Sequence, residues 1–237
     1  MKKRIILKLS GEALSAGSEK VINQQVIEEI SSEIKEVVSN EIEVGIVVGG
    51  GNIWRGVEAQ ELGMDRSQAD YMGMMATIMN SLALQDGLEK AGVDTRVQTT
   101  LRVDSVAEPY IRRKAIRHLE KGRVVIFAGG TGMPYFSTDT NTMLKAAEVD
   151  AQYVLMAKNG VDGVYDKDPN KFGDAIKYDK LTFREMLEKQ LKVIDLTAAT
   201  MAEENNLEVI IFDMNEKGNI VKVLNETKIG TKIKKGE

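Results

Sequence analysis

Short apolar segments alternate with segments of helical periodicity along the chain. The apolar segments are rich in β-branched residues and occupy residues 4–9, 43–48, 94–98, 123–128, 151–157 and 208–213. Continuous apolar runs of this length predict strands that are buried on both faces. Between them, apolar residues recur three and four positions apart from Val26 to Val38 and from Met72 to Leu88, which predicts two long helices.

The alternation of strands and helices predicts the architecture. Parallel strands need long crossover connections, so this order predicts an α/β fold with a largely parallel sheet. Further signals mark other helices: Pro109 opens one that Gly122 ends, and Thr182 with Glu185 forms a capping box. No linker, repeat or low-complexity tract interrupts the pattern, so residues 1–237 are expected to form a single domain.

A stripe of methionines runs from Met72 to Met79 on the second long helix. Methionine adapts its shape and can line a ligand surface, but at helical spacing it more often packs in a core or between subunits. We favour packing and keep the ligand surface as the alternative.

The composition restricts the chemistry that the chain can perform. Lys+Arg number 32 and Asp+Glu 36, a net charge of −4, so no basic surface for nucleic acid or an anionic membrane is expected. With no cysteine and one histidine, zinc sites of the usual kinds are excluded and no protein-held metal is predicted. That histidine, His118, lies in a basic stretch and is expected on a solvated helix face. An enzyme of this composition must use Lys, Arg, Asp and backbone amides.

The amino-terminal residues give no targeting signal. Lys8 and Glu12 interrupt the first apolar stretch, and no small-residue cleavage site follows it. No apolar run reaches the roughly 18 residues that a membrane span needs. The sequence therefore indicates a soluble, cytoplasmic protein.

Three loops that follow predicted strands carry the candidate chemistry. They comprise residues 8–12, 49–56 and 129–139, and each contains glycine. Glycine lets backbone N–H groups approach an anion closely, and a following helix N-terminus favours negative charge. Loops at the carboxyl ends of parallel strands assemble one site, so we expect the three to bind phosphate together.

Each loop also has an ordinary explanation. Tight strand–helix turns require glycine without any ligand, and Lys8 could be a lysine that extends its amine to solvent. Three such loops, two of which carry Lys8 or Arg55, favour phosphate binding over coincidence.

Several well-known motifs are absent. The chain has no Walker A sequence, no G-x-G-x-x-G dinucleotide fingerprint and no G-x-S-x-G hydrolase elbow. Asp166, Asp168 and Asn170 imitate the start of a calcium loop, but Lys171 and Lys177 replace the required glycine and glutamate. Residues 162–169 suit the wall of a nucleotide pocket better, or else a solvent-facing turn.

Five separated motifs resemble one known family. They are residues 8–14, Gly49-Gly50-Gly51-Asn52 with Arg55-Gly56, residues 70–74, residues 131–139, and residues 161–165 with Asp168-Pro169. In this order they resemble the bacterial uridylate kinases of the amino acid kinase superfamily. The resemblance covers essentially the whole chain and implies a three-layer αβα sandwich with a mostly parallel central sheet.

The resemblance also implies an activity and its site. The reaction is transfer of the ATP γ-phosphoryl group to UMP, with Mg²⁺, in pyrimidine nucleotide biosynthesis, by a homohexamer. The implied ATP-binding residues are Lys8, Leu9, Ser10, Gly11, Gly51, Arg55, Asn159, Tyr165 and Asp168. The implied UMP-binding residues are Gly50, Asp70, Thr131, Gly132, Met133, Pro134, Tyr135, Phe136, Ser137 and Thr138. The N-terminal part would bind mainly UMP and contact other subunits, and the C-terminal part would bind mainly ATP.

Lys8 and Asp139 are the candidate catalytic residues. Phosphoryl transfer depends on positioning and charge neutralisation more than on a strong base, which agrees with the scarcity of histidine. Lys8 would stabilise the transferring oxygens. Asp139 would orient Lys8 or a metal-bound water, or it could be only an N-cap or first-turn acid of the helix that follows.

Other functions stay open. The acceptor could be carbamate or an amino-acid carboxylate, or the chain could bind nucleotides without turnover; a dinucleotide-dependent oxidoreductase is disfavoured by the missing fingerprint. Residues 15–21 depart from the glycine- and aromatic-containing loop that the family associates with GTP regulation. We therefore do not extend GTP activation to this chain, while inhibition by UTP is expected from the resemblance.

Overall fold

The computed structural model describes residues 2–15, 20–56, 63–191, 193–225 and 229–236. In these ranges the main sheet has nine strands in the order β4-β3-β5-β2-β1-β6-β10-β11-β9. They are β1 (Arg4–Leu9), β2 (Glu43–Val48), β3 (Thr95–Thr99), β4 (Glu108–Pro109), β5 (Val124–Ala128), β6 (Tyr153–Lys158), β9 (Lys180–Thr182), β10 (Glu208–Asp213) and β11 (Thr231–Lys234). A separate hairpin pairs β7 (Val164–Tyr165) with β8 (Lys177–Tyr178).

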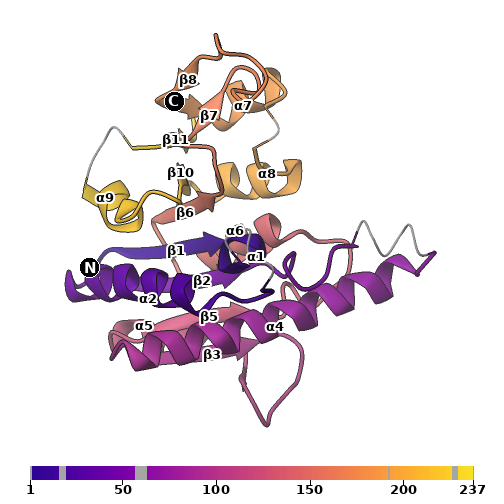
Figure 1. Cartoon of the computed structure of the whole chain (residues 1–237), viewed down its shortest axis with the longest axis vertical. Coiled ribbons are helices and arrows are strands. Elements are labelled where there is room, and N and C mark those ends of the chain that lie inside the picture. The colour runs from indigo at the N-terminus through magenta and orange to yellow at the C-terminus, as the bar shows by residue number, and fades with distance from the viewer. Residues whose placement is uncertain (1, 16–19, 57–62, 192, 226–228, 237) are drawn as a thin grey trace.

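The sheet is mostly parallel, as predicted. All neighbours from β4 to β10 run parallel, while β11 is antiparallel to β10 and parallel to β9. Figure 1 shows the sheet rising through the molecule from β3 near the bottom to β11 near the top. Three predicted strands match β1, β2 and β10 end to end, and the other three match β3, β5 and β6 within two residues.

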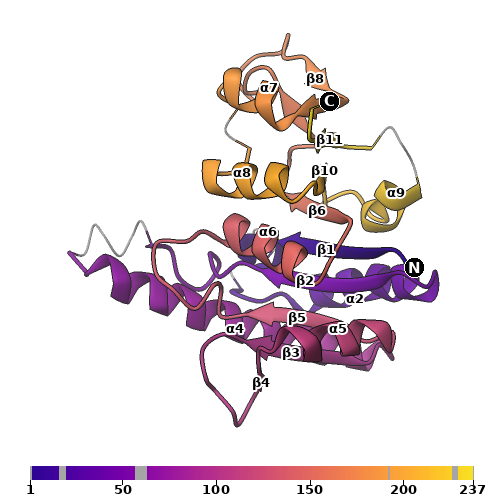
Figure 2. The same cartoon turned by 180° about the vertical axis from the view of Figure 1, so that it is seen from behind.

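Helices cover both faces of this sheet. One face carries α1 (Gly11–Ser15), α2 (Gln24–Ser39), α4 (Arg66–Lys90) and α9 (Asn219–Asn225). The other carries α5 (Arg112–Glu120), α6 (Thr138–Glu148), α7 (Phe183–Glu188) and α8 (Leu196–Glu204). The two layers are seen in turn from the front and from behind (Figures 1 and 2). The predicted αβα sandwich is therefore confirmed.

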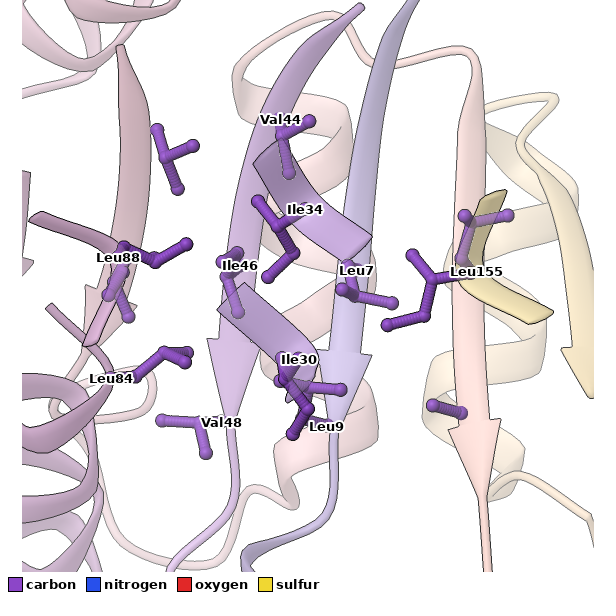
Figure 3. Close-up of a cluster of buried hydrophobic side chains, with 14 of the residues drawn as sticks. Leu7, Leu9, Ile30, Ile34, Val44, Ile46, Val48, Leu84, Leu88 and Leu155 are labelled. Atoms are coloured by element: carbon purple, nitrogen blue, oxygen red, sulfur yellow. The ribbon is translucent and has the colours of Figure 1, made fainter. Parts of the chain in front are cut away.

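The side chains on the two faces of the sheet pack into two separate hydrophobic cores. Leu7 and Ile46 pack with α2 and α4 in the cluster of Figure 3. Their neighbours Ile6 and Val47 face α5 and α6 in the second cluster. Because side chains alternate along a strand, every second residue of β1 and β6 lies on the α6 side. This alternation places the ends of these two strands in the site described below.

Two local predictions are wrong. Pro109 opens no helix: it pairs with Thr99 as part of β4, and α5 begins at Arg112. An edge strand leaves one side unpaired, so it tolerates a residue without an N–H. His118 is 8% exposed rather than solvated. It lies three residues after the buried Ala115, on the face of α5 that packs against the sheet.

The predicted capping box is confirmed, because the Thr182 hydroxyl accepts from the Glu185 N–H while the Glu185 carboxylate accepts from the Thr182 N–H.

The methionine stripe is divided: Met74 is buried, whereas Met72, Met75 and Met79 are 41–55% exposed. Packing inside this chain does not account for those three, so subunit contact stays a prediction. Among the described helices, none is long and apolar enough to cross a bilayer.

Candidate active site

The three glycine loops meet at the carboxyl edge of the sheet. β2, β5 and β3 lie on one side of β1, and β6 and β10 lie on the other. The loop after β1 therefore stands where the strand order reverses, which is the usual ligand position in an open α/β sheet.

Glycine is required at these loops by close contact and by backbone conformation. A Cβ on Gly11 would lie 2.7 Å from the Gly51 N and 2.9 Å from the Gly49 O, so the first two loops pack backbone against backbone. The third loop turns through Gly129, Gly130 and Gly132, whose φ angles are +77°, +59° and +80°. Only glycine adopts such angles without strain.

Helix α4 supports the glycine loops through two buried polar residues that the sequence reasoning missed. Asn80 donates from Nδ2 to the Gly49 O at 2.7 Å. Thr77 accepts from the Gly129 N–H at 2.9 Å while its hydroxyl donates to the Met74 O. The sequence signal for both residues is a polar side chain at a core position of a helix. Such a side chain needs a hydrogen-bond partner when it is buried.

Lys8 and Asp139 form an ion pair at the centre of the site. Lys8 Nζ lies 3.2 Å from Asp139 Oδ1, and the side chains are 11% and 18% exposed. Lys8 is on the α6 side of β1, and Asp139 is in the first turn of α6. The N-cap interpretation of Asp139 is wrong, because the cap is Ser137, whose hydroxyl accepts from the Thr140 N–H at 3.0 Å.

Lys158 joins this pair and was also missed. It ends β6 on the same face of the sheet as Lys8, which lies opposite Met156 in the adjacent strand. Its Nζ donates to the Val193 O at 2.9 Å. Burial lowers the pKa of Lys158, Asp139 opposes that shift, and the charge on Lys8 adds to it. A lysine at the end of an apolar strand was the signal that identified Lys8, and it applied equally here.

Asp195 ties α8 to the start of α6. Its carboxylate accepts from the Ser137 hydroxyl, from the Thr140 hydroxyl at 3.1 Å and from the Ala198 N–H at 2.9 Å. The same side chain therefore caps α8 and fixes the turn that presents Asp139. In the sequence, an aspartate before a helical segment indicates only an N-cap. The contacts of Asp195 with Ser137 and Thr140 depend on the fold and could not be predicted.

A cavity of about 310 Å³ lies beside the start of α6, because Ser137 and Thr138 belong to its lining. Of the ten predicted acceptor residues, seven line it: Gly50, Asp70, Thr131, Tyr135, Phe136, Ser137 and Thr138. Gly132, Met133 and Pro134 belong to the same loop but are not part of the lining. Trp54 and Arg66 also line this cavity, and the sequence reasoning had not singled them out as acceptor residues.

Two further cavities adjoin each other and share no lining residue with the first. The first, of about 390 Å³, is lined by Lys8, Ser10 and Asn159 together with Lys158. The second, of about 510 Å³, is lined by Tyr165 and Asp168. Both cavities are bounded by Val161, Gly163 and Val193.

The remaining predicted nucleotide residues are placed differently. Gly51 lines the cavity on the acceptor side. Arg55 forms an ion pair with Glu12 above the loops, and both side chains are about half exposed. The Leu9 side chain lies in the core, so only its backbone could meet a nucleotide.

Tyr165 remains a neutral phenol across the physiological range. Its hydroxyl donates to Asp162 Oδ1 at 2.6 Å, and this hydrogen bond raises the pKa of Tyr165 to about 12. The ring is therefore anchored at its polar end beside the cavity.

Within the described ranges, no cluster of three or more Asp, Glu or His side chains could hold a metal ion.

Comparisons with known proteins agree with this geometry. The sequence profile of the Amino acid kinase family matches residues 3–213. A uridylate kinase of Limosilactobacillus reuteri (strain DSM 20016) is 57% identical over 231 residues, covering 98% of this chain and 96% of that protein. The crystal structure of UMP kinase from Ureaplasma parvum matches with TM-score 0.95 and 40% identity, covering 99% of this chain and 100% of that one. UMP kinase from Bacillus anthracis matches with TM-score 0.96 and 39% identity, covering 99% and 97%.

Proposed function

This chain belongs to the amino acid kinase family, among its uridylate kinases, and we propose that it transfers the γ-phosphoryl group of ATP to UMP, giving UDP and ADP, in pyrimidine nucleotide biosynthesis. The observation that supports this most directly is the position of the Lys8–Asp139 pair. Lys8 lines a cavity together with the predicted nucleotide residues Ser10 and Asn159. Asp139 directly follows Ser137 and Thr138, which line the cavity of the predicted acceptor residues.

In the proposed reaction, Lys8 and Lys158 place two cationic groups at the ends of adjacent strands, where negative charge gathers on the transferring phosphoryl group. Asp139 fixes the Lys8 amine through the ion pair and partly offsets the repulsion between the two lysines. Ser10 and Gly11 offer backbone N–H groups to the ATP phosphates at the start of α1. Asn159, Tyr165 and Asp168 line the path toward the base and ribose.

On the acceptor side, Gly50 and the loop from Thr131 to Thr138 enclose UMP, and Asp70 accepts hydrogen bonds from the ribose hydroxyls. Helix α6 begins at Thr138, so its N-terminus points the backbone N–H groups of its first turn toward this region.

Magnesium is proposed to enter with ATP rather than to reside in the protein. Mg²⁺ is commonly held by one or two carboxylates together with substrate phosphates, which fits the few carboxylates at this site. Asp139 would be the nearest carboxylate to hold or orient it, and its chemical contribution is neutralisation of phosphate charge.

Lys158 gives a prediction on pH. If its protonated form assists transfer, kcat should fall on the alkaline side, and at a lower pH than an ordinary lysine would impose, because burial lowers the pKa of Lys158. In Lys158→Arg the guanidinium stays charged, so the alkaline limb of the kcat profile should move to higher pH. The profile is measured under saturating substrates, with Lys90→Arg as the exposed control. An unchanged limb would contradict this role of Lys158.

The proposed function is tested by coupled ADP release with Mg·ATP and a panel of UMP, CMP, dTMP, carbamate and N-acetylglutamate. Turnover with UMP alone is expected. Turnover with carbamate or N-acetylglutamate would keep the fold and overturn the acceptor. ATP binding without turnover of any acceptor would indicate a nucleotide-binding regulator.

We also propose that the chain works as a single domain assembled into a homohexamer, with acceptor and subunit contacts mainly in the N-terminal part. The exposed Met72, Met75 and Met79 face of α4 supports a subunit contact, because it leaves apolar surface uncovered on one chain. Inhibition by UTP is proposed and activation by GTP is not. The loop on which the GTP prediction rests includes residues 16–19, which lie outside the described residues.

A further inference from the structure

A charged pair on the first turns of α4 faces the acceptor cavity. Arg66 Nε donates to both carboxylate oxygens of Asp70, at 3.1 and 3.0 Å. The Asp70 side chain is 19% exposed, so it is shielded much more than a surface carboxylate. The one N–H of Nε is shared between the two oxygens, so the guanidinium charge is held centrally against the carboxylate.

The same two residues hold the glycine loop on the other side of the cavity. The Tyr135 N–H donates to Asp70 Oδ2 at 2.7 Å. The Arg66 guanidinium lies over the Tyr135 ring, with its central carbon 5.4 Å from the ring centroid. The Ser67 and Tyr135 hydroxyls are 3.4 Å apart. All three contacts join the start of α4 to one residue of the loop.

Tyr135 needs such support because its backbone is in the left-handed region. Its φ is +72°, which is uncommon for a residue with a side chain and unfavourable without compensating contacts. Tyr135 is also 66% exposed, so burial does not hold it in place. The Asp70 carboxylate, the Arg66 guanidinium and the Ser67 hydroxyl are therefore the contacts that fix this part of the cavity wall.

We propose that Arg66 is a positioning residue that holds Asp70 and Tyr135 as one unit, and that this unit makes the site select ribonucleotide over 2′-deoxyribonucleotide acceptors. The inference rests on the proposed function, in which Asp70 accepts from the ribose hydroxyls.

The selection follows from the acceptor capacity of a fixed carboxylate. Two oxygens offer about four lone-pair directions, and Arg66 and Tyr135 occupy some of them on the loop side. The rest stay available to the cavity that Asp70 lines. A 2′-deoxyribose leaves one of these lone-pair directions without a hydrogen-bond donor. A carboxylate held in one orientation cannot turn toward water to replace that hydrogen bond. Without Arg66 the carboxylate is free to turn, so the penalty against the deoxy sugar should disappear.

The chain carries its own probe for this test. Trp54 is its single tryptophan, lines the same cavity and donates from Nε1 to the Ala69 O at 3.0 Å. Its fluorescence therefore reports UMP and dUMP binding without turnover. We expect the unaltered protein to bind UMP about tenfold more tightly than dUMP, the ratio typical of one hydrogen bond to a charged group. In Arg66→Met the ratio should approach one, mainly through weaker UMP binding.

A double-substitution cycle separates positioning from direct contact. If Arg66 acts through Asp70, then Arg66→Met combined with Asp70→Asn should give the same UMP/dUMP ratio as Asp70→Asn alone. In steady state, Arg66→Met should raise KM for UMP while kcat and KM for ATP stay near their original values. Additive effects of the two substitutions would overturn the proposal.

Two further variants test whether the effect is specific to Arg66 and to its guanidinium. Arg184→Met removes an Arg from a similar pair on α7, where Arg184 Nε lies 2.8 Å from Glu188 Oε1, and should leave the ratio unchanged. Arg66→Lys keeps the charge but lacks the planar guanidinium that lies over the Tyr135 ring, so it should reduce the selection. Full selection in Arg66→Lys, or equal binding of UMP and dUMP by the unaltered protein, would contradict the inference. Absence of UMP turnover in the coupled ADP-release assay would contradict the proposed function itself.

Discussion

Lys8→Ala is expected to lower kcat by about a hundredfold to a thousandfold while the protein stays folded. The amine stands at the carboxyl end of β1, paired with Asp139 and only 11% exposed, where a charge interacts strongly with a developing phosphoryl charge. Removing one preorganised charged donor from such a site commonly costs this much in kcat. The measurement is single-turnover transfer from ATP to UMP, which separates chemistry from product release.

The fold should survive this substitution for a reason visible in the site. Lys158 remains beside Asp139 when Lys8 is removed, so the carboxylate keeps a cationic neighbour. The charge on Lys8 also lowers the pKa of Lys158, and its removal relieves that repulsion. Thermal unfolding and UMP binding by Trp54 fluorescence should therefore change little. Lys90→Ala, which removes an exposed lysine at the end of α4, is the matched control. Near-normal turnover in Lys8→Ala would remove the proposed role.

The sequence predicts most of the sheet because buried parallel strands carry an unambiguous pattern. β1 and β10 are mostly apolar, with polar residues at or beside their ends, and both of their limits were predicted to the residue. It does not predict β4, whose two residues have no apolar pattern and exist through pairing with β3. His118 was misplaced for a related reason: its burial is decided by the sheet that α5 packs against, which composition does not show.

The candidate site was predicted where chemistry and position coincide in one loop. Lys8 lies near the end of a strand, and the glycines and Asp139 follow strands, so the local sequence indicates them. Asn80 and Arg66 lie on α4 and support loops that are distant in sequence. The polar residue at a core position was a signal for Asn80, but only the folded contacts show which groups the two side chains bind. Lys158 could have been found with the signal used for Lys8, because Lys8 is the second-last residue of β1 and Lys158 is the last residue of β6.

Asp139→Asn is expected to lower kcat by about a hundredfold with little change in UMP affinity. The amide keeps the shape of the side chain but removes its charge, leaving Lys8 and Lys158 without their shared counter-charge. The lysines should then separate, and neither would hold its position for the transferring group. The loss concerns the reacting phosphoryl group, so binding of UMP, measured by Trp54 fluorescence, should stay within a few-fold.

The alternative is that Asp139 serves only as a first-turn acid of α6. Such an acid stabilises a helix by about 0.3–1 kcal/mol, so its removal would lower thermal stability slightly and leave kcat unchanged. Asn23→Ala is the control for a purely structural loss, because Asn23 caps α2 by accepting from the Gln25 N–H at 3.0 Å, outside the cavities of the site. That variant should lose about 1 kcal/mol of stability without loss of kcat. If Asp139→Asn behaves like Asn23→Ala, the ion pair with Lys8 is structural; if kcat falls while stability holds, Asp139 orients the lysines for transfer.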